Sequence, residues 1–169
     1  MIYLICSARS GSTSLQKYLQ AVMPLEKIVK VLIHQFPTEY ENMWEYGEDL
    51  LKRFPRSYLL DRRDKQAQAE SLCFRKLKYG DNFQHYHYKE YYDNLDNDLI
   101  TESKKYFQDH SKVLEGLSLK YDKKLLYYED ILQENYLKEL NIYNKSIYNK
   151  FLHPEHKERL FVKKDKTLT

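Results

Sequence analysis

The first twenty residues constrain the fold more than any other part of the chain, because they join an apolar run to a helical pattern through a small polar loop. Ile2–Cys6 is apolar and has the length of a strand. The loop Ser7–Thr13 follows and contains one glycine, Gly11. Apolar residues then recur at helical spacing, at Leu15, Tyr18, Leu19 and Val22. The pattern predicts a buried strand that turns tightly through Gly11 into a helix.

Such a turn is suited to binding a phosphate or sulfate group. Backbone N–H groups at the start of a helix point out of the turn and carry a partial positive charge. Ser10, Ser12 and Thr13 add hydroxyl donors, and Arg9 adds a planar cation that can hold two anionic oxygens at once. The alternative is that Ser12 or Thr13 only caps the helix and that Arg9 is a solvated surface residue.

The rest of the chain alternates between strand-like and helical segments. Further strands are expected at Lys27–Phe36, Ser57–Asp61 and Lys124–Tyr128. Helices are expected from Pro37-Thr38 to about Arg53, at Lys65–Lys78, from Leu99 to an end near Gly116 and Leu119, and at Glu129–Leu140, with shorter ones at His85–Leu95 and Pro154–Leu160. This alternation predicts an α/β three-layer sandwich, in which helices cover both faces of a short central parallel sheet. The length favours a single domain over residues 1–169.

Polar and cationic residues follow three of the expected strands. In open parallel sheets, ligands bind outside the carboxyl ends of the strands. Arg9–Thr13, His34 and Arg62-Arg63 should all emerge at that edge. For Arg62-Arg63 alone, a solvated basic turn is the alternative. The three loops together predict one anion-binding site.

Composition excludes several classes of protein. The net charge of +3 is too small to indicate a nucleic-acid partner, and no apolar run has the length of a membrane span. The N-terminus does not have the pattern of a secretory signal. Cys6 and Cys73 have the character of small buried residues in a reducing compartment, so a cytoplasmic location is expected. The 17 tyrosines could supply rings that stack on a sugar or an adenine.

Two familiar phosphate loops do not match the first loop. A Walker A motif requires a second glycine followed by Lys and Ser or Thr, and the loop has neither. A cysteine-phosphatase loop requires an Arg six residues after the cysteine, and six residues after Cys6 stands Ser12.

The second informative motif is the segment Leu59–Leu72, LLDRRDKQAQAESL. Together with Arg9–Thr13 it resembles the donor-binding segments of the sulfotransferases that use 3′-phosphoadenosine 5′-phosphosulfate as donor. Its sequence is particularly similar to that of the bacterial carbohydrate sulfotransferases of the trehalose type. The resemblance implies that residues 9–14, including Ser14, bind the 5′-phosphosulfate. It also implies that Arg63 and Ser71, eight positions apart, bind the 3′-phosphate.

Two further segments extend this resemblance. Leu125–Ile131, LLYYEDI, is similar to a strand-to-helix segment of the same enzymes, although Glu129 and Asp130 could equally be ordinary acids in the first turn of a helix. Lys163-Lys164 could meet the 3′-phosphate, as a basic C-terminal loop does in that family. The resemblance therefore implies a compact sulfotransferase-like fold.

Sulfuryl transfer to a hydroxyl requires a base for the acceptor's proton and a cation where the departing phosphate gains charge. His34 stands where the cytosolic members of the family carry their catalytic His, and Glu39 is the nearest match to the Glu used by the trehalose type. His34 is the preferred base and Glu39 the second candidate, while in a third interpretation His34 merely caps a strand. Arg9 would stabilise the leaving phosphate.

The expected function is therefore sulfuryl transfer to a carbohydrate or small alcohol, without a metal. The histidine pairs His85/His87 and His153/His156 lack the acids or cysteines that would complete a metal site. Two alternatives stay open. One is a nucleotide-dependent kinase or other phosphotransferase that uses ATP and Mg²⁺, and the other is a non-catalytic module that only binds a nucleotide.

Overall fold

A computed structural model describes residues 1–79 and 97–154, without the side chains of 74–79. Four strands and seven helices lie in these ranges. The strands are β1 (Ile2–Cys6), β2 (Ile28–Leu32), β3 (Ser57–Asp61) and β4 (Leu125–Tyr127). The helices are α1 (Ser12–Val22), α2 (Met43–Arg53), α3 (Lys65–Tyr79), α4 (Asn97–Tyr121), α5 (Tyr128–Ile131), α6 (Glu134–Glu139) and α7 (Lys145–Phe151).

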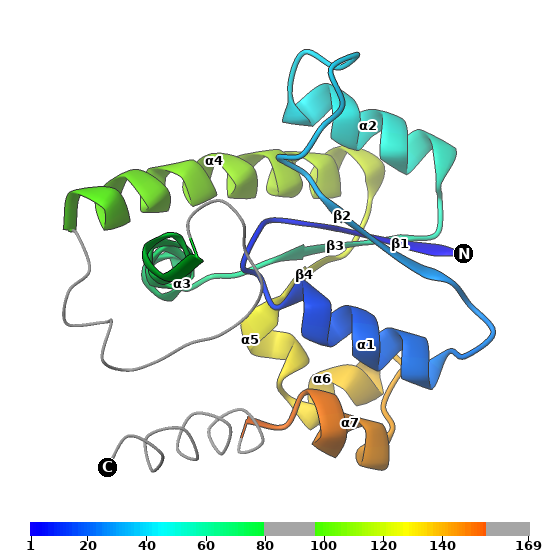
Figure 1. Cartoon of the computed structure of the whole chain (residues 1–169). Coiled ribbons are helices and arrows are strands. Elements are labelled where there is room, and N and C mark those ends of the chain that lie inside the picture. The colour runs from blue at the N-terminus through cyan, green and yellow to red at the C-terminus, as the bar shows by residue number, and fades with distance from the viewer. Residues whose placement is uncertain (80–96, 155–169) are drawn as a thin grey trace, which may run out of the picture.

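The four strands form one parallel sheet in the order β2-β1-β3-β4. β1 lies in the interior of the sheet, with Cys6 opposite Leu32 of β2 on one side and opposite Leu60 of β3 on the other. β4 completes the sheet beyond β3. Because all strands run the same way, the loops after β1, β2 and β3 emerge at one edge (Figure 1).

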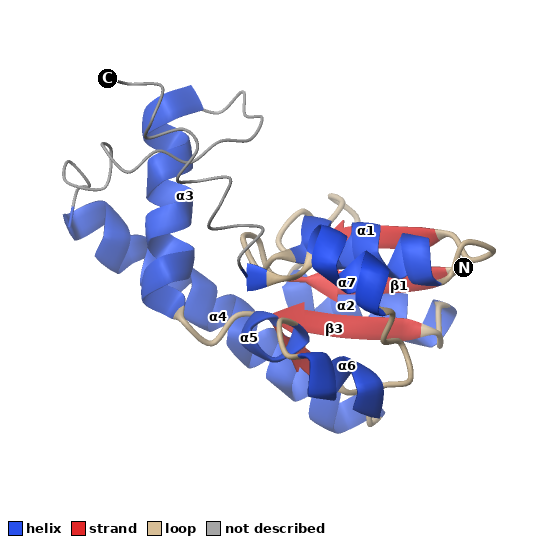
Figure 2. Cartoon of the chain, turned by 90° about the horizontal axis from the view of Figure 1, so that it is seen from below, coloured by secondary structure: helices blue, strands red, loops and turns tan. Residues whose placement is uncertain are grey.

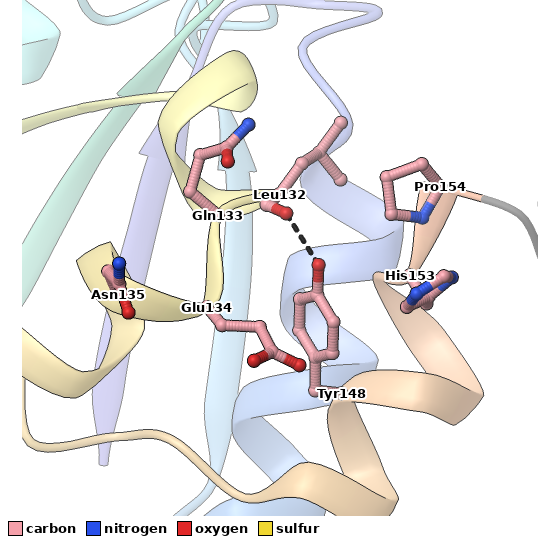
Figure 3. A pocket seen from close by; sticks show the side chains of 7 residues that line it. All are labelled: Leu132, Gln133, Glu134, Asn135, Tyr148, His153 and Pro154. Atoms are coloured by element: carbon pink, nitrogen blue, oxygen red, sulfur yellow. Dashed lines mark hydrogen bonds between the residues drawn. The ribbon is translucent and has the colours of Figure 1, made fainter.

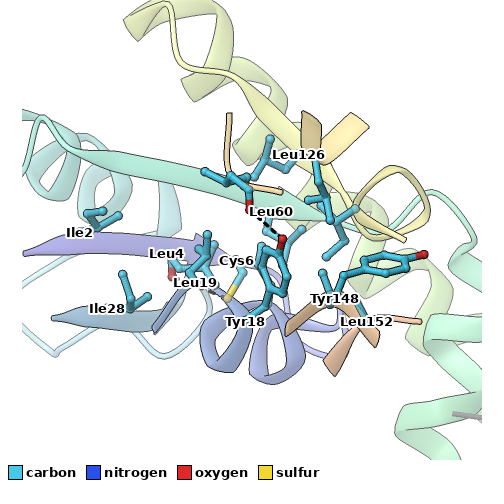
Figure 4. Close-up of a cluster of buried hydrophobic side chains, with 14 residues drawn as sticks. Ile2, Leu4, Cys6, Tyr18, Leu19, Ile28, Leu60, Leu126, Tyr148 and Leu152 are labelled. Carbon is cyan, nitrogen blue, oxygen red and sulfur yellow. Dashed lines mark hydrogen bonds between the residues drawn. The ribbon is translucent and has the colours of Figure 1, made fainter. Parts of the chain in front are cut away.

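Successive strand residues point to opposite faces, and each face is covered by helices. Leu4 and Leu60 belong to a cluster with residues of α1, α5, α6 and α7, shown in Figure 4. Their neighbours Ile5 and Leu59 belong to a second cluster with Leu114 and other residues of α2 and α4. Figure 1 shows these two helical layers above and below the sheet. The predicted three-layer α/β sandwich is confirmed.

α3 covers neither face of the sheet. It stands beyond the carboxyl edge and packs on the N-terminal half of α4 (Figure 2). A third buried cluster fills this contact and includes Ala8 of the first loop, Ala69 and Cys73 of α3, and Phe107 of α4. Cys6 and Cys73 are both buried free thiols. The first loop is thus packed against the pair α3 and α4.

Several predicted boundaries are wrong, for local reasons. The helix expected from Pro37-Thr38 begins at Met43, because Asn42 caps it by accepting a hydrogen bond from the Glu45 N–H at 3.0 Å. The strand expected over Lys27–Phe36 ends at Leu32, where the chain turns and the Gln35 N–H bonds the Leu32 carbonyl.

The helices of the second half also differ from the prediction. α4 continues past Gly116 to Tyr121, and this glycine lets the Trp44 ring approach, since a Cβ there would lie 2.6 Å from a ring carbon. The helix expected over Glu129–Leu140 is divided into α5 and α6 at an extended Gln133. The carbonyl before this break, that of Leu132, accepts a hydrogen bond from the Tyr148 hydroxyl at 2.6 Å.

The segment after Asn141, undecided from sequence, contains α7, which Asn144 caps. The predictions for His85–Leu95, His156 and Lys163-Lys164, and nearly all of the helix expected from Pro154, lie outside the described residues. Within residues 1–79 and 97–154, none of the helices combines the length and apolarity that a membrane crossing requires.

One buried hydroxyl ties α1 to the segment before α7. Tyr18 is fully buried; its hydroxyl donates to the Ile142 carbonyl at 2.6 Å and accepts from the Asn144 N–H at 3.0 Å.

We expect Tyr18→Phe to lower the free energy of unfolding by about 1–3 kcal/mol, because both backbone groups lose their partner. Urea denaturation checks this. Tyr106→Phe is the control, because the Tyr106 hydroxyl makes no hydrogen bond to any described residue, and an equal loss in both variants would contradict the assignment.

Candidate functional site

The loop after β1 has the backbone that an anion site requires. Gly11 is the N-cap of α1 and has a positive φ of 76°, and Arg9 also has a positive φ, of 59°. The glycine is required twice over, since a Cβ at Gly11 would lie 2.1 Å from a ring carbon of Tyr128. Ser12 and Thr13 lie inside the first turn of α1, so neither is the cap.

The hydroxyls of the loop have different partners. Ser10 is buried and donates to the Ser7 carbonyl at 2.7 Å, which stabilises the turn. Thr13 accepts a hydrogen bond from Lys30 Nζ at 3.0 Å, which brings a second cation to the loop. Ser12 is buried and Ser14 is half-buried. Lys30 was missed in the sequence, although a lysine inside the apolar run Ile28–Leu32 was the available signal.

Burial decides the chemistry of Cys6. It raises the pKa of this thiol to about 12, because the charged thiolate would lose its hydration. The thiol is therefore protonated at neutral pH and is not a nucleophile.

A buried carboxylate connects the loop to three other elements. Asp61, at the end of β3, is 1% exposed. It accepts hydrogen bonds from Ser7 at 2.7 Å, from Lys65 of α3 at 2.9 Å to each oxygen, and from Ser111 of α4. Gln68 of α3 extends the network by donating to the Ser7 hydroxyl at 3.0 Å and to the Ala8 carbonyl at 2.6 Å. The network fixes the loop relative to β3, α3 and α4.

This network is not predicted from the sequence. The signal that indicates it is an acid at the end of an apolar strand, Asp61, with a lysine four residues later at the start of a helix. Lys65 also donates to the Arg62 carbonyl and to Gln68, so its ammonium group is fully engaged inside the protein. It balances the charge of Asp61.

The two predicted motifs meet at the edge of the sheet. Arg9 Nε donates to the hydroxyl of Ser71, which is buried on α3, at 2.9 Å. Arg63 is held elsewhere: Asp130 accepts from both terminal nitrogens at 2.6 Å, and the guanidinium carbon lies 4.0 Å from the centre of the Tyr127 ring. Among the described residues, no hydrogen bond joins Arg63 to Ser71.

The two candidate bases lie in different surroundings. His34 is half-buried and its ring is stacked on that of His110, with ring centres 5.3 Å apart and planes 7° apart. Tyr106 lies against both rings, 4.1 Å from His110 and 6.0 Å from His34. Glu39 is exposed in the turn before α2, and no described residue makes a hydrogen bond or ion pair with it. α4 therefore surrounds His34 with rings, and nothing comparable holds Glu39.

Similarity to known proteins adds no constraint. Comparison with family models, with curated proteins and with solved structures finds no match. Within the described ranges, no group of three or more His, Cys, Asp or Glu side chains is arranged to hold a metal ion. The carboxyl edge of the sheet thus provides hydrogen-bond donors and cations that can bind an anion, and a histidine stacked on a second histidine.

A separate cavity of about 490 Å³ lies between the α5–α6 connection and the end of α7 (Figure 3). Its lining includes Glu134, Tyr148 and His153. It contains none of the predicted site residues except His153, one of the histidines considered for metal binding. The loop after β1 is the better candidate, because it concentrates backbone donors and cations.

We expect Lys65→Met to lower the free energy of unfolding by about 3 kcal/mol, because it leaves the Asp61 carboxylate buried without a counter-charge. The double variant Asp61→Asn/Lys65→Met should lose less than Lys65→Met alone. Urea denaturation of the variants measures the coupling. Lys112→Met is the control and should change stability by less than about 0.5 kcal/mol, because its pair with Asp109 is exposed. Additive losses in the double variant would show that the pair is not coupled.

His110 predicts a pH dependence of stability. Burial first, and then the charge of His34, lower the pKa of His110 to about 4 from the ordinary value of 6.5. Between these two values the unfolded chain binds a proton that the folded chain does not, so stability is lost as pH falls from about 6.5 to about 4. We expect His110→Phe to lose about 1–2 kcal/mol less than wild type between pH 7 and pH 5, measured by urea denaturation. Parallel losses in the two proteins would refute this origin.

Proposed function

We propose that this protein is a sulfotransferase, which moves a sulfuryl group from 3′-phosphoadenosine 5′-phosphosulfate to a hydroxyl of a carbohydrate or small alcohol. The observation that carries the proposal is the hydrogen bond between Arg9 and Ser71. These residues lie 62 positions apart, in the two motifs that resemble the donor-binding segments of sulfotransferases. Their contact supports the idea that the two motifs serve one ligand.

In this proposal the loop binds the 5′-phosphosulfate. The N–H groups of the first turn of α1 and the hydroxyls of Ser12, Thr13 and Ser14 would donate to its oxygens, with Arg9 beside them, while Ser10 holds the turn through its bond to the Ser7 carbonyl. Lys30, held against Thr13, adds positive charge at the same place. Arg63 and Ser71 would bind the 3′-phosphate.

The reaction is an in-line displacement at sulfur. The acceptor oxygen attacks the sulfur, and the bond from sulfur to the bridging oxygen breaks. The electron pair leaves with the 5′-phosphate of 3′-phosphoadenosine 5′-phosphate. His34 takes the acceptor's proton, with Glu39 as the alternative base. Arg9 stabilises the charge that develops on the leaving oxygen.

The buried network bears on the kinase alternative. A phosphotransferase that uses ATP and Mg²⁺ needs carboxylate oxygens free to hold the ion directly or through water. At the end of β3, both oxygens of Asp61 are already engaged by Lys65, with Ser7 and Ser111 as further donors. This arrangement favours sulfuryl transfer, which requires no metal here. We also propose a cytoplasmic location, in keeping with the free thiols of Cys6 and Cys73.

Nucleotide binding is the first prediction of this function. At about one hundred times its Kd, 3′-phosphoadenosine 5′-phosphate should stabilise the protein by about 2.7 kcal/mol, which raises Tm by roughly 5–10 °C. ADP and ATP–Mg²⁺ should raise it less. Arg9→Ala should remove most of the shift, whereas Arg56→Ala should retain it, because Arg56 pairs with Glu26 at the opposite edge of the sheet. A thermal-shift titration measures these effects.

Each other outcome points to a different function. A larger shift with ATP–Mg²⁺ would support the phosphotransferase, and no shift with any nucleotide would refute the proposal. Selective binding of the 3′-phosphorylated nucleotide, without sulfate transfer from the labelled donor to any hydroxyl in a panel of sugars and alcohols, would indicate the non-catalytic module.

A further inference from the structure

The side chain proposed to bind the 3′-phosphate is already held by a carboxylate. The two terminal nitrogens of Arg63 donate to the two oxygens of Asp130, each at 2.6 Å. This is a bidentate pair, and the central carbon of the same guanidinium lies over the Tyr127 ring, 4.0 Å from its centre. Asp130 therefore presents to Arg63 the same pair of oxygens that a phosphate would present.

The backbone around Arg63 is anchored separately. Glu129, the neighbour of Asp130 on α5, accepts hydrogen bonds from the N–H groups of Arg63 and Asp64, each at 3.1 Å. Asp64 in turn accepts from the Ala67 N–H at 2.9 Å, at the start of α3. The position of the main chain therefore does not depend on the contact between Arg63 and Asp130. The guanidinium can exchange its partner while the turn stays in place.

The pair is also open to solvent. The Arg63 side chain is 52% exposed and that of Asp130 30% exposed, so a ligand can reach it from water. Exposed ion pairs of this kind contribute little to stability, so the contact is easily exchanged. A phosphate dianion carries twice the charge of the carboxylate and can displace it. A nucleotide without a 3′-phosphate has no anionic group at this position that could replace the Asp130 carboxylate on Arg63.

We propose that Asp130 regulates the donor site by occupying Arg63 until a 3′-phosphate replaces it. This inference rests on the proposed function, because it takes Arg63 as the ligand of the 3′-phosphate. The edge formed by the two terminal nitrogens of Arg63 cannot make two bidentate pairs at once, so a phosphate that binds this edge competes with the Asp130 carboxylate. Asp130 thereby weakens the binding of the donor nucleotide and stabilises the empty site.

The test compares Asp130→Asn with wild type by isothermal titration of 3′-phosphoadenosine 5′-phosphate. The variant should bind about two- to fivefold more tightly, because the competing charge is gone. Its affinity for adenosine 5′-phosphate, which lacks the 3′-phosphate, should not change. Glu26→Gln is the matched control: it removes a carboxylate paired with Arg56 at the opposite edge of the sheet and should leave both affinities unchanged. Asp130→Ala serves as a second variant should Asp130→Asn fold poorly.

A double variant locates the effect. In the background of Arg63→Ala, removal of the Asp130 carboxylate should give no gain. If Asp130→Asn binds 3′-phosphoadenosine 5′-phosphate no more tightly than wild type does, this inference is overturned. The proposed function stands in that case, because wild type still binds the nucleotide. An equal gain for adenosine 5′-phosphate, or for Glu26→Gln, would overturn it as a general charge effect. If neither wild type nor Asp130→Asn binds the 3′-phosphorylated nucleotide, both proposals fail.

Discussion

Asp61 accepts hydrogen bonds from Ser7, Lys65 and Ser111 while it is almost completely removed from water. A buried carboxylate is tolerable only when its charge and its lone pairs are satisfied, and here one ammonium and two hydroxyls do so. Because these donors come from the loop after β1, from α3 and from α4, the same requirement aligns all three at the carboxyl edge. The positions of Arg9 and Ser71 depend on this alignment.

The sequence predicts the layers of this fold because their cause is local. Ser57–Asp61 is a strand in both prediction and structure, and the apolar periods of α1 and α3 are visible in the sequence. Gly116 stands near the predicted end of a helix, yet it lies inside α4, which continues to Tyr121. Its actual role is contact with Trp44, seventy-two positions away, which no local pattern contains. Boundaries and close approaches depend on such distant partners.

The candidate site likewise has features that the sequence predicts and features that depend on contacts between distant elements. The turn at Gly11 and the cationic ends of the strands follow from motif and spacing. The contacts between elements cannot be predicted in this way. They are the pairing of Lys65 with Asp61, the contact of Lys30 with Thr13, and the packing of the α4 rings around His34. Each of these is chosen by packing between elements, so it requires the assembled structure. Sequence thus indicates which anion chemistry is available, and the fold determines which cations remain for a ligand.

The bond between Tyr18 and Ile142 has a consequence for the order in which the chain matures. The two residues lie 124 positions apart, so on the ribosome α1 is complete long before its buried hydroxyl can find a partner. Contacts of such separation slow folding, because a large loop must close before they form. β1 and α1, which carry the first loop, therefore stay incompletely packed until the segment that leads into α7 has been synthesised. Newly made chains should depend on chaperones most strongly during this interval.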